Sequence, residues 1–283
     1  MFNNKTTNPD IYVIWDGQNK PFCKENTVKE YAELCWGTPC IFNVTEPTLT
    51  VYQAKEKNIG IGVVILPGGG YLAEAIQSEG HDVARVLAKQ GITAAVLKYR
   101  LPNPVTSDEP HMVPLSDTRG AIKLLRQLAE KYGVKTGKVG VLGFSAGSHL
   151  ATVTSLWISR NAAENPDFSG LMYGTTNLSV ENVKWLEESL YFRKLTGEEL
   201  AQNRLLDLVR PETPPVFLVH AYDDNVCMPE ETTLYAQKLY ENNVPVEVHL
   251  FPKGGHGFGL GRKEDGTNQW VKLFVNWLKT NIV

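Results

Sequence analysis

A serine enclosed by two glycines constrains the fold of this chain more than any other feature. Residues 143–147 read GFSAG, after a short apolar run at 138–142 and before a stretch typical of a helix at 148–151. When strand, tight turn and helix follow in this order, the serine sits at the apex on a strained backbone with its hydroxyl exposed. Glycines two residues on either side of Ser145 suit such a turn, because backbone packs against backbone there and a Cβ would clash. The pattern predicts a nucleophile elbow; a chance Gly-x-Ser-x-Gly is the alternative.

From about residue 59 onward, apolar runs alternate with helical patterns. Short continuous apolar runs predict buried strands, and apolar residues at helical spacing followed by glycine predict helices. The expected strands are 11–15, 41–44, 49–53, 61–66, 92–97, 138–142, 168–173, 215–219 and 246–251. The expected helices are 78–90, 114–132, 145–158, 229–242 and 268–279. The alternation predicts an α/β fold, with a mostly parallel central sheet and helices on both faces.

The length and composition favour a single domain. The chain has 283 residues, of which 42% are hydrophobic, and this is enough for one α/β domain with a full core. No linker-like stretch, charge block or repeat divides it, so we expect one domain over 1–283. Residues 1–45 form a less regular N-terminal extension. The polar, helix-prone segment at about 175–210 interrupts the alternation and predicts a small helical cap beside the functional site.

Charge and hydropathy exclude some classes of partner. The formal net charge is -3 and no basic cluster is present, which argues against binding to nucleic acid or to an anionic membrane surface. No apolar run reaches the length of a membrane span. Residues 1–10 are polar and lack the apolar core of a signal peptide. We therefore expect a cytoplasmic location if the chain begins as given, and a secreted or periplasmic one if a signal peptide has been removed; the oligomeric state is unknown.

The cysteines predict no metal site. Cys23, Cys35, Cys40 and Cys227 have spacings that match no zinc-binding pattern. Scattered free thiols are the favoured interpretation. A disulfide among the first three cysteines is the alternative, and it would indicate export to an oxidising compartment.

A serine hydroxyl is a weak nucleophile and needs a base and a residue that orients the base. Of the six histidines, His256 lies in a glycine-rich loop at 253–259, directly after the last predicted strand. Such a loop can bring the imidazole back over the sheet, so His256 is the predicted base; an exposed turn residue is the alternative. His149 on the elbow helix and His220 at a strand end have structural interpretations. For His220 we expect hydrogen bonds that hold the loop at 220–226, the acid loop, where the orienting acid is expected.

Two aspartates compete for the role of the orienting acid. Residues 220–226 read HAYDDNV and follow the strand at 215–219. We favour Asp224, four residues after the histidine that ends the strand, with Asp223 capping the loop backbone; the opposite assignment stays open. The resulting chain order of serine, aspartate and histidine is the one found on the α/β-hydrolase sheet.

A second glycine-rich loop predicts an oxyanion hole. Residues 67–71 read PGGGY and come directly after a predicted strand. Glycines let backbone N–H groups turn toward an oxyanion at small steric cost, so Gly69, Gly70 and the N–H of Ala146 are the predicted donors. Tyr71 is the predicted wall of the substrate pocket. A phosphate cradle is disfavoured, because neither Gly-x-Gly-x-x-Gly spacing nor a Lys-Ser/Thr pair is present.

These motifs together resemble the α/β-hydrolase superfamily. The closest likeness is to its carbohydrate-esterase branch, the acetyl-xylan-esterase-like and feruloyl-esterase-like proteins. The likeness extends from about residue 47 to the C-terminus. It rests on the segments 67–71, 98–102, 143–151, 220–224 and 251–260. The resemblance implies a catalytic triad of Ser145, Asp224 and His256, with oxyanion donors in the triple-glycine loop and at Ala146.

The resemblance also implies an activity. We expect a serine esterase that removes short acyl groups, acetyl first, from a small-molecule or oligosaccharide ester of the xylan type. No metal or organic cofactor is expected. Two other functions remain open on the same sequence: a serine peptidase of the prolyl-oligopeptidase type, and a non-catalytic binding protein with the hydrolase fold. The second typically loses a triad residue or the oxyanion glycines, which this chain retains.

Overall fold

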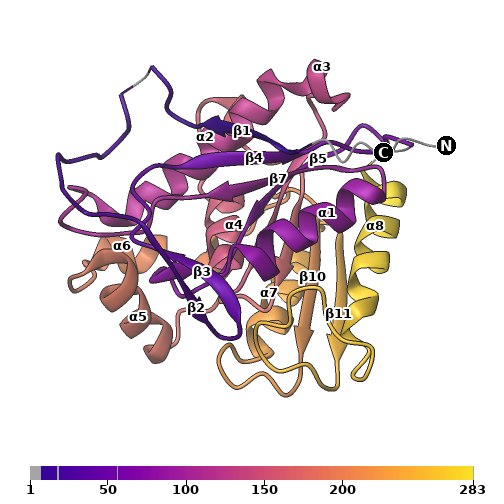
Figure 1. Ribbon diagram of the computed structural model, residues 1–283. Helices are drawn as coiled ribbons and strands as arrows, with labels where there is room; N and C mark the ends of the chain where they lie inside the picture. The colour runs from indigo at the N-terminus through magenta and orange to yellow at the C-terminus, as the bar shows by residue number, and fades with distance from the viewer. Residues whose placement is uncertain (1–7, 18, 56, 283) are drawn as a thin grey trace.

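The computed structural model describes residues 8–17, 19–55 and 57–282. Its centre is an eight-stranded sheet with the strand order β1-β4-β7-β5-β8-β9-β10-β11 (Figure 1). β1 (Asp10–Val13) and β4 (Thr48–Tyr52) form an antiparallel edge. The neighbouring strands run parallel to one another: β7 (Thr93–Lys98), β5 (Gly62–Leu66), β8 (Val139–Phe144), β9 (Ser169–Met172), β10 (Val216–Ala221) and β11 (Val246–Phe251). The mostly parallel sheet confirms the predicted fold class.

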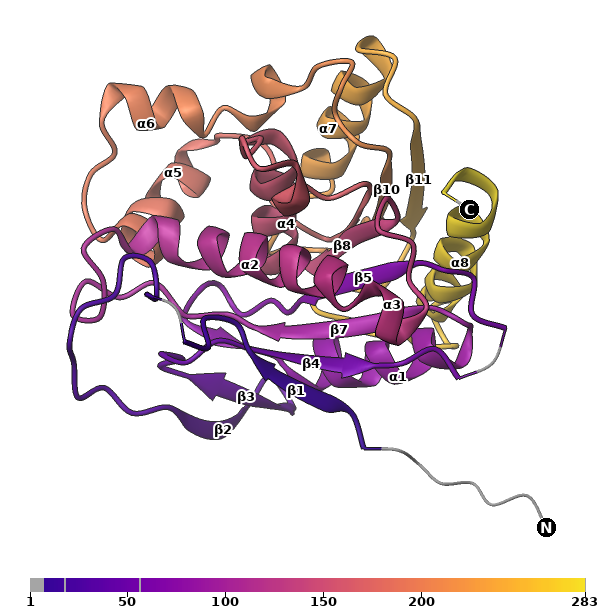
Figure 2. The same cartoon turned by 90° about the horizontal axis from the view of Figure 1, so that it is seen from above.

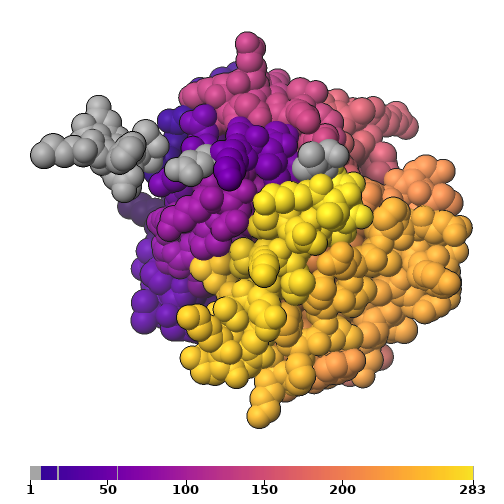
Figure 3. Space-filling model, turned by 90° about the vertical axis from the view of Figure 1, so that its right-hand side faces the viewer, coloured from indigo at the N-terminus to yellow at the C-terminus, as the bar shows by residue number. Residues whose placement is uncertain are grey.

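Helices cover both faces of this sheet (Figure 2). α1 (Asp82–Lys89) and α8 (Trp270–Asn281) share one apolar core with the strands. The core on the other face is formed with α2 (Val113–Gln127), α3 (Ala129–Tyr132), α4 (Ala146–Leu156) and α7 (Glu230–Glu241). Successive side chains of a strand point to opposite faces, so a strand that is buried throughout, such as β5, fits a sheet covered on both sides. Figure 3 shows the C-terminal part of the chain, in orange to yellow, over much of one side of the molecule.

The observed helices are more divided than the predicted ones. The helix expected at 78–90 begins with a π-helical turn, η1 (Gln77–His81), and continues as α1. The helix expected at 114–132 is preceded by η2 (Pro110–Met112) and splits into α2 and α3. Two further short helical turns are η3 (Ala162–Glu164) and η6 (Thr267–Gln269). Across the described ranges, no helix is both long enough and apolar enough to cross a membrane.

A second, three-stranded antiparallel sheet lies beside the central one. It contains β2 (Tyr31–Cys35), β3 (Thr38–Phe42) and β6 (Ala73–Glu74). β2 and β6 are missing from the predicted strands. β2 is exposed along most of its length, so it lacks the apolar pattern on which such predictions depend, and β6 has only two residues. Residues 1–7 of the predicted N-terminal extension lie outside the described residues.

The hairpin of β2 and β3 carries a disulfide between Cys35 and Cys40. The preference for scattered free thiols is therefore wrong for this pair, while Cys23 and Cys227 are free. The antiparallel register explains the difference, because it brings the two Cα atoms to 6.0 Å, within the range that a disulfide requires. A disulfide is the alternative that the sequence linked to an oxidising compartment.

The segment expected to form a cap lies at one end of the molecule, away from α8 (Figures 1 and 2). Glu231 of α7 anchors its beginning by accepting hydrogen bonds from the N–H groups of Thr176 and Asn177. Its role as a cap, and the single domain over 1–283, stay predictions. Its elements are α5 (Val180–Leu186), η4 (Glu187–Tyr191), α6 (Gly197–Gln202) and η5 (Leu205–Leu208).

The loops that matter for chemistry leave the sheet at one edge. Because the carboxyl ends of parallel strands lie along the same edge, the loops after β5, β8, β10 and β11 come together there. These loops contain residues 67–72, Ser145, 222–228 and 252–259. The fold thus brings the predicted functional segments to one place.

Candidate active site

Ser145 occupies a strained turn between β8 and α4. Its backbone has φ 51° and ψ −118°. Residues other than glycine rarely adopt this conformation, and those that do occur preferentially at functional sites. A Cβ at Gly143 would collide with the carbonyl of Gly147, and a Cβ at Gly147 would collide with the carbonyl of Leu66. The Ser145 N–H is bonded to the carbonyl of Met172. Packing on both sides therefore holds the serine in the turn that the sequence predicts.

His256 lies opposite this serine, in the loop that follows β11. Its Nε2 is 2.8 Å from the Ser145 Oγ, and its Nδ1 is 2.8 Å from Oδ2 of Asp224. Gly255 and Gly257 in the same loop have φ values of 62° and 70°, which glycine tolerates at little cost. The glycine-rich sequence lets the loop turn back toward the serine.

Asp224 is buried and fully hydrogen-bonded. Its Oδ1 accepts the N–H groups of Val226 and Cys227 at 2.8 and 3.0 Å, and its Oδ2 also lies 3.2 Å from Nε2 of His220. Burial alone would raise the pKa of this carboxyl, but the hydrogen bonds from His220 and His256 hold that pKa well below its usual range. Asp224 is therefore an anion, suited to orient an imidazole and to stabilise its cation.

The neighbouring aspartate and histidine support these loops. Asp223 accepts the N–H of Gly255 at 2.7 Å, so it joins the acid loop to the histidine loop through backbone rather than through the imidazole. His220 lies within reach of the Cys227 carbonyl and of Thr232 Oγ1, in addition to Asp224. The structure thus brings Asp224, the favoured acid, to His256. The expectation that Asp223 caps its own loop is wrong, because Asp223 accepts the N–H of Gly255 in the histidine loop, while Asp224 accepts the N–H groups of Val226 and Cys227 in the acid loop.

The loop after β5 presents backbone N–H groups beside the serine. Gly69 and Gly70 have φ values of 134° and 64°. Within the described ranges, the N–H groups of Gly69, Gly70 and Ala146 donate to no other protein group. The N–H of Gly68 is different, because it donates to Oε2 of Glu79 at 2.8 Å. The three unused donors are the ones that the sequence predicts for an oxyanion hole.

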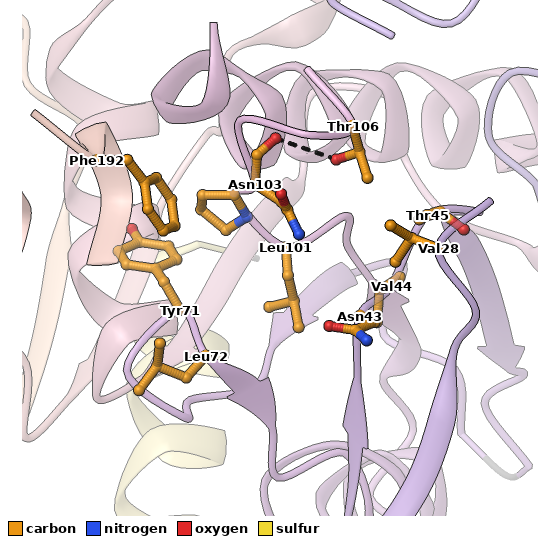
Figure 4. A pocket seen from close by; sticks show the side chains of 11 residues that line it. Val28, Asn43, Val44, Thr45, Tyr71, Leu72, Leu101, Asn103, Thr106 and Phe192 are labelled. Atoms are coloured by element: carbon orange, nitrogen blue, oxygen red, sulfur yellow. Dashed lines mark hydrogen bonds between the residues drawn. The ribbon is translucent and has the colours of Figure 1, made fainter. Parts of the chain in front are cut away.

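Tyr71, the predicted pocket wall, is only 2% exposed. Its hydroxyl lies 2.9 Å from Nδ1 of His149, and its ring stacks on Trp185 of α5 with the centroids 5.5 Å apart. Trp185 in turn donates from Nε1 to the carbonyl of Gly70 at 3.3 Å. Tyr71 therefore supports the loop at 67–72, the proposed oxyanion loop, from behind, and it also lines the cavity shown in Figure 4.

Two buried residues at the site are absent from the sequence-based prediction. Glu79 accepts the Tyr173 hydroxyl at 2.8 Å as well as the Gly68 N–H. The Tyr173 oxygen accepts the N–H of Gly259 at 3.0 Å, and its ring packs edge-on against His256. The sequence contains a signal for Glu79. It precedes Val83 and Leu87 at intervals of four residues, so its carboxylate falls on the buried face of the helix.

No group of three or more His, Cys, Asp or Glu residues in the described part of the chain is arranged to hold a metal ion. The site that the geometry defines is a serine, histidine and aspartate constellation with backbone donors beside it.

Residues 63–260 match the family model described as the alpha/beta hydrolase fold. The chain belongs to this family, as the strained serine turn and the parallel sheet indicate. An acetylxylan esterase of Xylanibacter ruminicola is 30% identical over 235 residues, which cover 80% of this chain and 46% of that protein. Endo-1,4-beta-xylanase B of Butyrivibrio fibrisolvens is 30% identical over 228 residues, which cover 77% of this chain and 35% of that protein. This chain therefore spans less than half the length of both relatives.

A solved structure resembles the chain over most of its length. It is the acetyl ester-xyloside bifunctional hydrolase from Caldicellulosiruptor lactoaceticus, with a TM-score of 0.74 and 31% identity. The match covers 84% of this chain and 89% of that one.

His149 makes the stability of this region depend on pH. Burial lowers its pKa to about 4, against about 6.5 in the unfolded chain. Because the unfolded state binds the proton more tightly, this stability is present above pH 6.5 and is lost as the pH falls toward 4. We expect the free energy of unfolding to fall by about 2–3 kcal/mol from this group between pH 7 and pH 4.5. Urea titrations of wild type and His149→Gln at both pH values measure it, and equal pH dependence in the two proteins would contradict the prediction.

Proposed function

We propose that this protein is a serine esterase that hydrolyses short-chain acyl esters, with acetyl groups on carbohydrate as its substrates. The observation that carries the proposal is the hydrogen-bonded chain from Ser145 through His256 to the buried Asp224. A serine in this arrangement can attack a carbonyl carbon, because the imidazole removes its proton and the carboxylate holds the imidazole in place.

The first half of the reaction forms an acyl-enzyme. His256 Nε2 takes the proton of Ser145 as Oγ attacks the ester carbonyl, and Asp224 stabilises the resulting imidazolium. The developing oxyanion is held by the N–H groups of Gly69, Gly70 and Ala146, which are otherwise unused in the described ranges. His256 then passes its proton to the departing alcohol, so the ester bond breaks and the acyl group stays on the serine oxygen.

The second half repeats these steps with water. His256 takes a proton from a water molecule as the water oxygen attacks the acyl carbonyl, and the same donors hold the second oxyanion. When the intermediate collapses, the proton returns to Ser145 and the carboxylic acid leaves. His256 and the same backbone donors therefore serve both halves, and the net reaction converts ester and water to alcohol and carboxylic acid.

The choice of acetyl groups on carbohydrate is supported by the relatives. Their names describe an acetylxylan esterase, a xylanase and an acetyl ester-xyloside hydrolase. An acetyl esterase of Salmonella agona is a more distant relative, 23% identical over 245 residues. Two of these names, those of the acetylxylan esterase and of the acetyl ester-xyloside hydrolase, combine an acetyl ester with a xylose-based carbohydrate.

Replacing Ser145 by alanine tests the proposed nucleophile. We expect Ser145→Ala to lower the rate of ester hydrolysis by roughly 10⁴–10⁶-fold, because the members of a triad act as a unit. The measurement is the initial rate on p-nitrophenyl acetate, butyrate and octanoate and on acetylated xylo-oligosaccharide, with a dipeptide amide as the peptidase substrate. Near-normal turnover in the variant would contradict the assignment. Serine-dependent cleavage of the amide alone would favour a peptidase. The absence of activity on every substrate would favour a binding protein.

The two adjacent aspartates provide a matched pair of variants. We expect Asp224→Asn to lower kcat by about 10⁴-fold, because an amide at this position leaves the imidazole in the wrong tautomer. Asp223→Asn keeps an oxygen acceptor for the Gly255 N–H, so we expect kcat to change less than about tenfold. Steady-state kinetics on p-nitrophenyl acetate compare the two. A larger loss in Asp223→Asn would reverse the roles of the two residues.

A further inference from the structure

A small cavity lies beside the oxyanion loop, and segments distant in the sequence converge on it (Figure 4). Its volume is about 160 Å³. Tyr71 and Leu72 contribute one wall, Asn103 and Asn43 lie across from them, and Phe192 enters from the segment expected to form a cap. None of the lining side chains carries a charge. The cavity therefore suits an uncharged ligand.

A tight turn at 69–72 places the cavity wall near the proposed nucleophile. A Cβ at Gly68 would lie 2.8 Å from Cβ of Ser145, and the N–H of Leu72 donates to the carbonyl of Gly69 at 3.0 Å. A turn closed by such a bond spans less than about 7 Å between its end Cα atoms. The cavity wall at Leu72 thus lies next to the loop that would hold the ester carbonyl.

The lining combines an open aromatic face with an unused amide. Phe192 is 40% exposed and has φ 57°, a strained conformation for an aromatic residue that surrounding contacts must hold in place. Asn103 Oδ1 accepts the N–H of Val105, whereas its Nδ2 donates to no other group in the described part of the chain. A sugar ring offers both partners, because its C–H faces are apolar and its hydroxyl oxygens accept hydrogen bonds.

We propose that this cavity is a subsite for an uncharged sugar ring in the alcohol part of the ester, an assignment that rests on the proposed esterase function. Phe192 packs on the face of the ring and Asn103 Nδ2 donates to a hydroxyl. Pockets for drug-sized ligands begin at roughly 300 Å³, so this smaller cavity suits one ring rather than a longer segment.

Two variants separate binding of the sugar from the chemistry. Phe192→Ala removes the aromatic face, and Asn103→Asp keeps the acceptor for Val105 while it removes the donor. We expect each to raise KM for acetylated xylo-oligosaccharide by roughly three- to tenfold, with KM and kcat for ethyl acetate, whose alcohol part has no ring, unchanged within twofold. Tyr240→Ala is the control, because it removes a 74% exposed ring that does not line the cavity.

The outcomes distinguish the subsite from the function. Hydrolysis of the sugar ester with KM unchanged in both variants, or equal losses on both substrates, overturns the subsite and leaves the esterase function in place. If wild type cleaves p-nitrophenyl acetate but no sugar ester, the proposed substrate is wrong. Inhibition of that cleavage by unacetylated xylotriose, weakened three- to tenfold in Phe192→Ala, then still supports the subsite; no inhibition overturns it.

A second inference comes from the buried carboxyl of Glu79, which lies between two loops of the site. One oxygen accepts the N–H of Gly68 at 2.8 Å, where a Cβ would lie 2.7 Å from the same oxygen. The other accepts the hydroxyl of Tyr173, and that hydroxyl accepts the N–H of Gly259. A continuous path of hydrogen bonds therefore runs from the oxyanion loop to the loop of His256.

This path of hydrogen bonds holds both the backbone donors of the oxyanion loop and the imidazole of His256 in place. The bond to Glu79 turns the N–H of Gly68 away from the hole and so orients the peptide units that follow, which carry the N–H groups of Gly69 and Gly70. At the other end, Tyr173 holds the histidine loop by its hydroxyl and His256 by its ring, with 5.2 Å between the ring centroids. Small displacements of either loop would move a reacting group.

We infer that Glu79 is a positioning residue that fixes the oxyanion loop and the histidine loop relative to each other. Its carboxyl contacts neither Ser145 nor the Asp224 side chain among its hydrogen-bond partners, so it acts through Gly68 and Tyr173. Loss of this carboxyl should therefore lower kcat and leave KM nearly unchanged.

The test compares Glu79→Gln with Glu231→Gln, a second buried carboxyl that accepts several hydrogen bonds but lies outside this path. We expect Glu79→Gln to lower kcat on p-nitrophenyl acetate by roughly 10- to 100-fold, with KM within twofold. Labelling of Ser145 by a fluorophosphonate should slow by a similar factor. Glu231→Gln should leave kcat within twofold at temperatures where unfolding curves show both variants folded.

Tyr173→Phe keeps the aromatic ring and removes the hydroxyl, so it tests the same path if Glu79→Gln does not fold. The double variant should lose little more kcat than the worse single one, because both act through one chain of bonds. Equal kcat and equal labelling in Glu79→Gln, Glu231→Gln and wild type overturn the inference, as do additive losses in the double variant. A wild type that neither hydrolyses esters nor reacts with the probe instead contradicts the proposed function.

Discussion

The tight packing of the turn at Ser145 is the constraint on which the rest of the site depends. β8 enters the turn and α4 leaves it so closely that neither Gly143 nor Gly147 has room for a Cβ. The serine is therefore held with positive φ, between the end of β8 and the loop that follows β5. Because α4 and β5 are both parts of the packed core, the position of the hydroxyl is set by the fold rather than by a mobile loop. The loops that carry the histidine and the backbone donors then have to pack against a hydroxyl whose position is already fixed.

Much of this could be predicted from sequence, for identifiable reasons. Continuous apolar runs indicate the successive strands. The turn at Ser145 and the loop of His256 are indicated by glycine-rich segments, because tight turns of this kind require glycine. Only the sequence separation of four residues from His220 favoured Asp224 over Asp223. Glu79 and Tyr173 could not be identified in the same way. The spacing of Glu79 with Val83 and Leu87 indicates only that its side chain is on the buried face of the helix, and a tyrosine at a strand end carries no spacing signal. Their roles depend on contacts between segments far apart in the chain.

The buried polar groups share a common arrangement around the site. Asp224 is satisfied by backbone N–H groups and two histidines, and Glu79 by a backbone N–H and a tyrosine. Burial of each carboxyl without partners would cost several kcal/mol, so each acts as a fixed point to which neighbouring loops must bond. Asp223 adds a direct link between the acid and histidine loops. Loops that are individually rich in glycine thereby become ordered where they meet.

The same links extend to the segments that would contact the alcohol part of a substrate. Trp185 stacks on Tyr71 and donates to the carbonyl of Gly70, which ties α5 to the oxyanion loop. Glu231 ties the beginning of the same segment to α7, close after the acid loop. The segment at about 175–210 is thus attached to the oxyanion loop and to α7, while its exposed Phe192 faces the cavity. Changes in this segment can alter the shape of the cavity without moving the sheet, so under the proposed function the choice of alcohol can vary while the serine stays in place.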